Sequence, residues 1–303
     1  MDINFEYYKV FYYAARYRNL TRAAAALGSN QPNVTRIVKL LEAQLGCRLF
    51  VREPRGISLT GEGEKLYAHV EAAYEHLLRA QEEIGGLSAE GAGTVEVGAT
   101  ETALHLFLLE AMRDFKLKYP KIRIKVHNHS TPEIMGLLAA GKLDFALATT
   151  PVKEPKAPSH FSRETVRRFR EILAGGPQYR YLGAGPVSLR DLTGLPWIGL
   201  GRGTATYELY REFFREHNAG IELDMEVATS DLLLPLIQSS LGIGFVPEEL
   251  AQPLLSRKLL VEIPLDCPPP PRSIQLISDR GRGRSASADI FYRRLSPKQP
   301  GGG

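Results

Sequence analysis

Extended and helical patterns alternate along most of this chain, and this alternation restricts the possible folds more than any other feature. The first series has strands at residues 94–98, 122–128 and 143–148, with helices at 103–118 and 132–140 between them. Strands that alternate with helices of this length form a mostly parallel sheet covered by helices. We therefore predict an α/β domain for this part of the chain.

A second series follows a proline-rich crossover at residues 151–158. It has strands at 197–200, 223–228 and 244–246, with helices at 205–217 and 231–241. The prolines at 268–271 then return the chain to the first series, to which a strand at 273–278 and a helix at 286–295 are added. We expect two similar α/β subdomains with a cleft between them, the first from about residues 92–160 and 268–300 and the second from about residues 161–267.

The N-terminal part is organised differently, because its apolar residues recur at helical spacing. The first 27 residues look helical, a break follows at Gly28, and a second helical stretch covers residues 31–45 before Gly46. Two short extended pieces at 48–52 and 57–59 flank a turn. Ala24, Gly28, Val34 and Ile37 have the spacing at which a helix-turn-helix places its small, turn and apolar residues. We therefore predict an all-α winged helix-turn-helix over residues 1–61.

Positive charge is concentrated in the same region. Residues 1–60 contain nine Lys or Arg and four Asp or Glu, a net charge of +5, whereas the rest of the chain has a net charge of −1. Phosphate contacts supply most of the sequence-independent affinity for DNA. The asymmetry therefore favours a double-stranded DNA partner.

The start of the second helical stretch carries the side chains best suited to reading DNA. Asn30 can cap the helix, and Gln31 and Asn33 can form bidentate hydrogen bonds with adenine edges, although both also fit an ordinary polar surface. The arginines of the extended pieces form a wing that would contact phosphates. The full set of expected DNA-binding residues is Thr21, Arg22, Asn30, Gln31, Pro32, Asn33, Thr35, Arg36, Arg48, Arg52 and Arg55.

A long helix is predicted next, with an apolar seam at alternating four- and three-residue steps. The seam consists of Leu66, Val70, Ala73, Leu77, Ala80, Ile84 and Leu87. Such heptads are typical of a coiled coil, so residues 62–91 would form a dimerising linker helix and a glycine-rich hinge before an effector domain at 92–303. The alternative is an amphipathic helix buried within one domain.

The helix-turn-helix region resembles the DNA-binding domain of LysR-type transcriptional regulators. The motifs that carry the resemblance are Leu20-Thr21-Arg22-Ala23-Ala24, Asn30-Gln31-Pro32-Asn33-Val34-Thr35, Leu41-Glu42, Leu45-Gly46, Leu49-Phe50, Arg52 and Leu59-Thr60. Further along the chain, Tyr119-Pro120, residues 141–147, Asp191-Leu192 and residues 242–247 are similar to the effector domain of that family. The resemblance covers nearly the whole chain.

The resemblance implies a winged helix-turn-helix, a dimerising helix and a two-subdomain effector domain with a periplasmic-binding-protein fold. It also implies a homodimer and frequently a dimer of dimers. Three features depart from the family pattern: Asn30 stands where Ser is usual, Ser29 replaces an apolar turn residue, and residues 159–170 are unusually rich in Arg and Glu.

Candidate effector-binding residues follow the predicted strands, because ligands bind at the carboxyl ends of strands in folds of this kind. They are Thr100, Glu101, Thr102, Asn128, Ser130, Thr131, Thr149, Thr150, Gly201, Arg202, Gly203, Thr204, Thr229 and Ser230. Our hypothesis is that Arg202 and helix dipoles hold an anionic group while Glu101 holds an amine or hydroxyl, so that the effector is anionic or zwitterionic. Thr131, Thr204 and Ser230 also fit helix N-caps.

Other functions find less support in the sequence. The two cysteines lack disulfide or metal spacing, His127 and His129 fit rim residues better than a metal pair, and no nucleophile or phosphate-loop motif occurs. We expect no metal, no cofactor and no enzymatic activity, although an enzyme fused to a DNA-binding domain and an architectural DNA-binding protein remain as alternatives. The sequence lacks a signal peptide and a run of about 18 apolar residues, so we expect a cytoplasmic protein without a membrane partner.

Overall fold

The computed structural model describes residues 3–53, 56–84, 93–151 and 160–297. The chain divides into two compact units, residues 1–88 and residues 89–303. Each unit has its own hydrophobic clusters, so the two are described separately.

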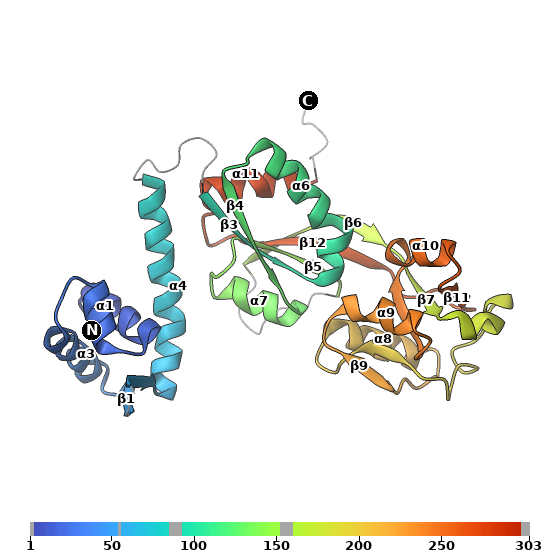
Figure 1. Cartoon of the computed structure of the whole chain (residues 1–303), viewed down its shortest axis with the longest axis horizontal. Helices are drawn as coiled ribbons and strands as arrows, with labels where there is room; N and C mark the ends of the chain where they lie inside the picture. Colours follow the sequence, from blue (N-terminus) through green and yellow to red (C-terminus); the bar gives the residue numbers. More distant parts are fainter. Residues whose placement is uncertain (1–2, 54–55, 85–92, 152–159, 298–303) are drawn as a thin grey trace. The chain divides into compact units, whose positions relative to one another are not determined.

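The N-terminal unit is a helix-turn-helix followed by a two-stranded wing and a long helix (Figure 1). Its elements are α1 (Phe5–Tyr17), α2 (Leu20–Ala26), α3 (Gln31–Leu45), β1 (Phe50–Glu53), β2 (Gly56–Leu59) and α4 (Gly61–Ile84). The expected helix over the first 27 residues is in fact two helices. Arg18 ends α1 in the left-handed conformation, with φ of 48°, and the Asn19 side chain caps α2 by accepting from the amides of Thr21 and Arg22.

Small residues allow the first three helices to pack closely. Ala14, Ala23 and Ala24 are buried with Val34 and other apolar residues of α3 in one cluster. Gly28, with φ of +60°, turns the chain between α2 and α3, a conformation that glycine adopts without steric cost. The spacing that predicted the helix-turn-helix therefore corresponds to real contacts.

The apolar seam predicted on the long helix is divided between two environments. Val70 is buried against Phe11 of α1, and Leu66 packs against the same cluster. Ala73 is exposed, and Leu77 is 44% exposed. The side chains of Ala80 and Ile84, and Leu87 altogether, lie outside the described residues. The first part of the seam thus packs within the N-terminal unit itself. This is what the alternative of an amphipathic helix buried within one domain predicts for these residues.

The first subdomain of the C-terminal unit is a five-stranded sheet with the order β4-β3-β5-β12-β6. The strands are β3 (Gly93–Ala99), β4 (Ile122–Asn128), β5 (Phe145–Thr149), β6 (Phe161–Phe169) and β12 (Arg272–Asp279). β4, β3 and β5 are parallel, whereas β12 is antiparallel to both β5 and β6. The parallel arrangement predicted for the first series is therefore confirmed, and the strand added later, β12, runs antiparallel to its two neighbours.

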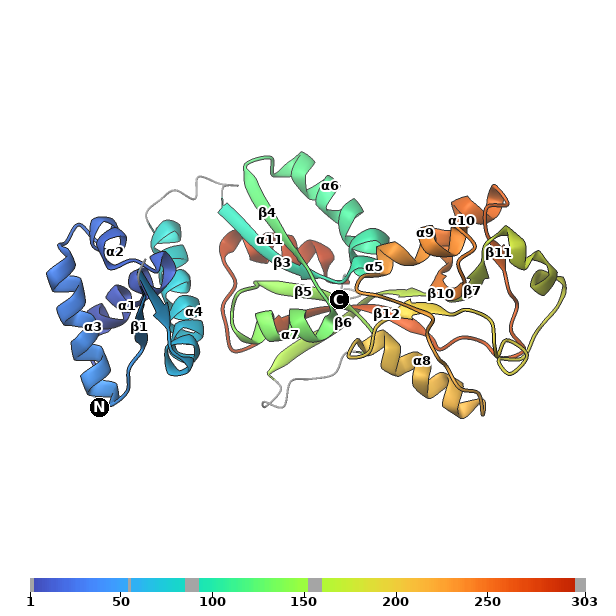
Figure 2. The ribbon, with the colours of Figure 1, turned by 60° about the horizontal axis from the view of Figure 1, so that its bottom comes forward.

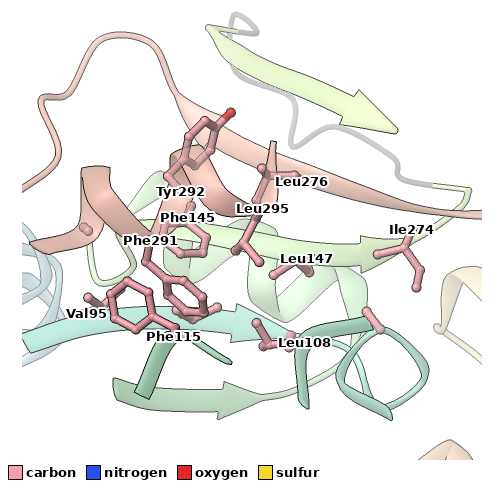
Figure 3. Close-up of a cluster of buried hydrophobic side chains, with 14 of the residues drawn as sticks. Val95, Leu108, Phe115, Phe145, Leu147, Ile274, Leu276, Phe291, Tyr292 and Leu295 are labelled. Atoms are coloured by element: carbon pink, nitrogen blue, oxygen red, sulfur yellow. The ribbon is translucent and has the colours of Figure 1, made fainter. Parts of the chain in front are cut away.

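Helices cover both faces of this sheet (Figure 1). The helices are α5 (Glu101–Ala103), η1 (Leu104–Leu108), α6 (Leu109–Lys118), α7 (Thr131–Ala139) and α11 (Ala286–Leu295). Phe145 and Leu147 pack with α6 and α11 on one face, whereas Ala146 and Ala148 pack with α7 on the other. Figure 3 shows the first of these clusters, in which Phe115, Phe145 and Phe291 lie together.

The Arg- and Glu-rich segment is the outer strand of this sheet, β6, and not the entry to the second subdomain. β6 pairs with β12 from Phe161 to Phe169, with a bulge at Val166, so the chain leaves the first subdomain after Phe169 and not at about residue 160. An edge strand carries charged side chains that prevent pairing with other molecules. Here they also form contacts, because Glu164 accepts from the Tyr292 hydroxyl at 3.1 Å and Arg167 donates to the Leu106 carbonyl. The charges hide the strand pattern in the sequence.

The second subdomain is built on a three-stranded sheet, β10-β7-β11, and a parallel pair, β8-β9 (Figure 2). Its elements are β7 (Glu171–Gly175), η2 (Pro177–Ala184), β8 (Ile198–Leu200), α8 (Ala205–Glu216), β9 (Met225–Val227), η3 (Ser230–Leu232), α9 (Leu233–Gln238), β10 (Ile243–Pro247), α10 (Glu248–Ser256) and β11 (Val261–Glu262). Leu173 of β7 packs with α8, and its neighbours Ile172 and Ala174 pack with α9. The sequence pattern predicts α8, α9 and β8 to β10 but not β7, α10 or β11.

Candidate DNA-reading surface and effector site

Asn30 caps α3 and begins a chain of hydrogen bonds over its first turn. The Asn30 carbonyl oxygen Oδ1 accepts from the Asn33 amide at 2.9 Å, which confirms the predicted cap. The Asn33 side chain donates to Ser29 Oγ at 3.1 Å and accepts from Arg36 Nη2, also at 3.1 Å. These two hydrogen bonds fix the orientation of the Asn33 amide and leave it one N–H and one lone pair for a base contact.

The other predicted residues of the helix-turn-helix differ in how far their side chains are free to contact DNA. Gln31, Pro32 and Arg36 are exposed on α3, as are Thr21 and Arg22 at the start of α2. The Thr35 hydroxyl is already used, because it donates to the Gln31 carbonyl at 2.8 Å. Gln31 is thus the residue of this turn with the most freedom to form base contacts.

The wing is fixed to α3 by Glu42, a residue named above only within a motif that carries the family resemblance. Its Oε1 accepts from the amides of Leu49 at 2.8 Å and Phe50 at 3.2 Å. A carboxylate near a helix C-terminus is unfavourable unless another group compensates its charge, so its position was a signal for such a partner. Arg48 and Arg52 are exposed, and Arg55 lies outside the described residues.

A cavity of about 460 Å³ lies between the two subdomains, and we call it the hydroxyl cavity. Nine of its lining residues are Ser or Thr. The lining consists of Thr100, Glu101, Thr102, Asn128, His129, Ser130, Thr131, Thr149, Leu200, Thr204, Ala205, Thr206, Ala228, Thr229 and Ser230. It therefore brings together ten of the residues predicted from strand ends and adds His129, Leu200, Ala205, Thr206 and Ala228.

Four polar residues of the hydroxyl cavity bind one another in two pairs. The Glu101 carboxylate accepts from Asn128 Nδ2 at 2.5 Å and pairs with His105 Nε2 at 2.7 Å. Thr102 Oγ1 and Ser230 Oγ, from different subdomains, lie 3.2 Å apart. By contrast, Thr100 Oγ1 is buried and has no hydrogen-bond partner among the described residues. A buried hydroxyl without a partner is costly, so it is a good candidate for a ligand contact.

Helix starts also lie at this cavity. Thr204 caps α8, since its Oγ1 accepts from the Tyr207 amide at 3.1 Å. The residue before α7 is Ser130 and not Thr131, and the residue before η3 is Thr229 and not Ser230, so those two predicted caps are each displaced by one residue. Ser130 donates to Glu133 through its amide and its hydroxyl, and these hydrogen bonds lower the pKa of Glu133.

Four predicted effector residues do not line the hydroxyl cavity: Thr150, Gly201, Arg202 and Gly203. Thr150 joins β5 to β12, because its Oγ1 accepts from the Ser273 amide at 2.8 Å. The Arg202 side chain is 80% exposed and lies 4.0 Å from Glu226. The structure therefore does not bring Arg202 into the cavity, where an anion clamp would have to lie. Among the described residues that line the cavity, none is Lys or Arg.

A second cavity, of about 550 Å³, adjoins the first and is mostly apolar. We call it the aromatic cavity, and its lining consists of Thr102, Glu171, Trp197, Ile198, Gly199, Leu200, Thr206, Tyr207, Tyr210, Ile221, Leu223, Ser230, Leu233, Phe245, Pro247 and Arg272. Arg272 Nη1 donates to Glu171 Oε2 at 2.8 Å, and the Tyr210 hydroxyl donates to the same oxygen. Burial raises the pKa of Tyr210 well above its ordinary value. None of these three residues was predicted from the sequence as a site residue.

The described part of the chain gives no sign of a metal centre or a membrane span. No group of three or more His, Cys, Asp or Glu side chains there could hold a metal ion. In the same residues, no helix has both the length and the apolar character needed to cross a bilayer.

Together, the winged helix-turn-helix and the two-subdomain unit with a cleft define a DNA-binding regulator that carries a ligand-sensing domain. Residues 5–64 match the model of the bacterial regulatory helix-turn-helix proteins of the lysR family, and residues 88–298 match the LysR substrate binding domain. The chain belongs to the LysR family and is a transcriptional regulator of that type.

Individual proteins agree with this assignment. The chain is 26% identical over 254 residues to the HTH-type transcriptional regulator BbuR of Bordetella bronchiseptica, which covers 84% of this chain and 77% of that protein. The fold resembles full-length CbnR complexed with its target DNA, with a TM-score of 0.68 and 19% identity over 97% of this chain and 100% of that one. It also resembles ArgP from Mycobacterium tuberculosis, with a TM-score of 0.73 and 15% identity over 97% of this chain and 98% of that one.

Proposed function

We propose that this regulator reads its operator through the first turn of α3 and responds to a small, oxygen-rich molecule in the hydroxyl cavity. The observation that carries the ligand site is the convergence of residues from several strand ends on one cavity, with the buried Thr100 hydroxyl left without a partner. Concave sites with a few convergent polar groups are typical of small-molecule binding. Hydroxyls and helix N-termini suit acceptor oxygens, so a carboxylate or a hydroxylated molecule is the effector class that we favour.

The response would be allosteric. The Thr102–Ser230 contact joins the two subdomains at the edge of the cavity, so a ligand there would change how they close on each other. We propose a homodimer, and a dimer of dimers on DNA, that carries this change to paired half-sites one or more helical turns apart. The exposed Ala73 and Leu77 of α4 are available for such a dimer contact. We further propose that the protein acts in the cytoplasm and has no catalytic step.

A thermal-shift screen of the full chain against carboxylates, amino acids and sulfur or phosphorus oxyanions would test the sensor function. A ligand at about 100 times its Kd adds roughly 2.7 kcal/mol of stability. Each ligand found is then added to a DNase footprint of the operator. A ligand that is recovered unchanged and alters the footprint supports the proposal, whereas one that is converted to product supports an enzyme. A footprint that no ligand alters favours an architectural DNA-binding protein.

Replacement of Gln31 by alanine is expected to weaken operator binding by about 1–3 kcal/mol, or roughly 5- to 150-fold, because a bidentate contact with one base would be lost. Binding to unrelated DNA should change little. The measurement is a fluorescence-anisotropy titration with operator and with scrambled duplex at one salt concentration.

The matched control is Arg48→Ala on the wing. Loss of a phosphate contact should weaken binding to both duplexes alike. It should also reduce the slope of log K against log salt concentration by about one unit. Equal losses on both duplexes for Gln31→Ala would show that Gln31 does not read bases.

Replacement of Thr100 by valine is expected to reduce effector affinity about three- to tenfold, because the ligand would lose one hydrogen bond. The free protein should lose little stability, since Thr100 Oγ1 has no partner among the described residues. Thr150→Val is the control, because Thr150 binds Ser273 and lines neither cavity. Calorimetric titration that finds wild-type affinity in Thr100→Val would remove Thr100 from the site.

A further inference from the structure

The aromatic cavity has the composition of a binding site for a ring. Tyr210 and Phe245 stack beside it with centroids 4.1 Å apart and planes 9° apart. Trp197, Ile221 and Leu223 form other parts of its wall. Aromatic side chains offer large, rigid apolar surfaces, so a flat apolar group gains more here than in the hydroxyl cavity.

Four polar side chains of this cavity, those of Glu171, Thr206, Tyr210 and Arg272, belong to one network. Arg272 and Glu171 are 3% and 6% exposed, and their charges offset each other. Arg272 Nη2 also donates to Thr206 Oγ1 at 3.2 Å. Within the described residues, Arg272 Nε is buried without a hydrogen-bond partner. The network therefore leaves one N–H donor for which an acceptor oxygen is the natural partner.

The two cavities adjoin each other, because Thr102, Leu200, Thr206 and Ser230 line both. One molecule with a polar end and an apolar end could therefore occupy both cavities. Hydroxyls dominate the lining of the first cavity, whereas apolar side chains and the single donor of Arg272 line the second.

We propose that the effector is amphipathic, with an oxygen-rich end in the hydroxyl cavity and a ring-sized apolar body in the aromatic cavity, where an acceptor oxygen reaches Arg272. This inference rests on the proposed function and names the class of effector. It assigns specificity for the apolar body to the wall formed by Trp197, Tyr210 and Phe245.

Trp197 is the only tryptophan of the chain and lines the aromatic cavity, so its fluorescence reports occupancy directly. The probe is 4-nitrobenzyl alcohol, a neutral ring with acceptor oxygens whose nitro group quenches indole emission. We expect saturable quenching in the full-length wild type, with at least a tenfold weaker Kd in Ile221→Phe, which fills the cavity. Leu223→Phe, at a second wall position, gives an independent version of the same measurement. Thr150→Val should quench like the wild type.

Linear, non-saturating quenching, or equal Kd values in the wild type and both filled variants, would overturn the inference. The effector found by thermal shift gives the second readout, because its affinity should also fall at least tenfold in Ile221→Phe. If the effector binds both proteins equally but loses affinity in Thr100→Val, the proposed function stands and the aromatic cavity is not part of the site. If no ligand stabilises the protein while the probe still binds, the proposed function fails and the cavity remains a ring site.

Discussion

Replacement of Arg272 by methionine is expected to lower the free energy of unfolding of the C-terminal unit by about 3–5 kcal/mol. The substitution removes the guanidinium from a pair in which both side chains are buried, and it leaves the Glu171 carboxylate with the Tyr210 hydroxyl as its remaining partner. The effect should appear in urea unfolding followed by Trp197 fluorescence, because Trp197 lies in the second subdomain near this pair.

The double variant Arg272→Met/Glu171→Met separates the cost of burying an unpaired charge from the contribution of the ion pair to the free energy of unfolding. A buried ion pair replaced by apolar residues of similar size is often neutral in stability, so the double variant should recover most of the loss. Simple addition of the two single losses would show that the residues are not coupled, contrary to the 2.8 Å hydrogen bond between them.

Replacement of Phe291 by alanine is expected to cost about 3–5 kcal/mol, because it removes a fully buried ring from the core of the first subdomain. The Phe291 centroid lies 4.3 Å from that of Phe115 and 5.8 Å from that of Phe145, so the cavity would open at the centre of the cluster (Figure 3). Urea unfolding followed by far-ultraviolet circular dichroism measures the loss.

Phe5→Ala is the matched control, since the Phe5 side chain is 52% exposed on α1. An exposed substitution of this kind usually changes stability by less than about 0.5 kcal/mol. A loss of stability in Phe291→Ala as small as that expected for Phe5→Ala would mean that the Phe291 cluster is not the core of the first subdomain.

Elements with a strong periodic pattern were predictable from the sequence. The predicted strand 122–128 and helix 286–295 coincide with β4 and α11, and the strand-end rule placed ten residues in the hydroxyl cavity. The rule works because parallel strands present their carboxyl ends at one edge of the sheet, whatever the ligand. These elements and the strand-end residues could be predicted because they depend on the spacing of apolar residues nearby in the sequence and on the strand order that follows from it.

The missed parts depend on contacts between distant residues. β6 has charged side chains along an edge, so no alternation marks it as a strand. Arg272 and Glu171 are 101 positions apart, and their pairing appears only when β7 and β12 start side by side. The glycines that flank Arg202 favour a ligand-binding loop, but its side chain is 80% exposed and lines neither cavity. A charged residue at the start of an apolar strand, as at Glu171 and Arg272, was the available signal for the buried pair.

The register of β6 and β12 gives the second subdomain the topology of a hairpin loop. Phe169 and Arg272 are opposite each other in one antiparallel ladder, and the whole of residues 170–271 is inserted between them. Its two ends are therefore neighbours before any of its own contacts form, so closing it costs little additional chain entropy once the ladder exists. A two-residue turn could in principle replace the insert without changing the strand order of the first sheet. In this sense the effector unit is one α/β domain interrupted by another, a modular arrangement in which the inserted part can diversify while the host sheet keeps its register.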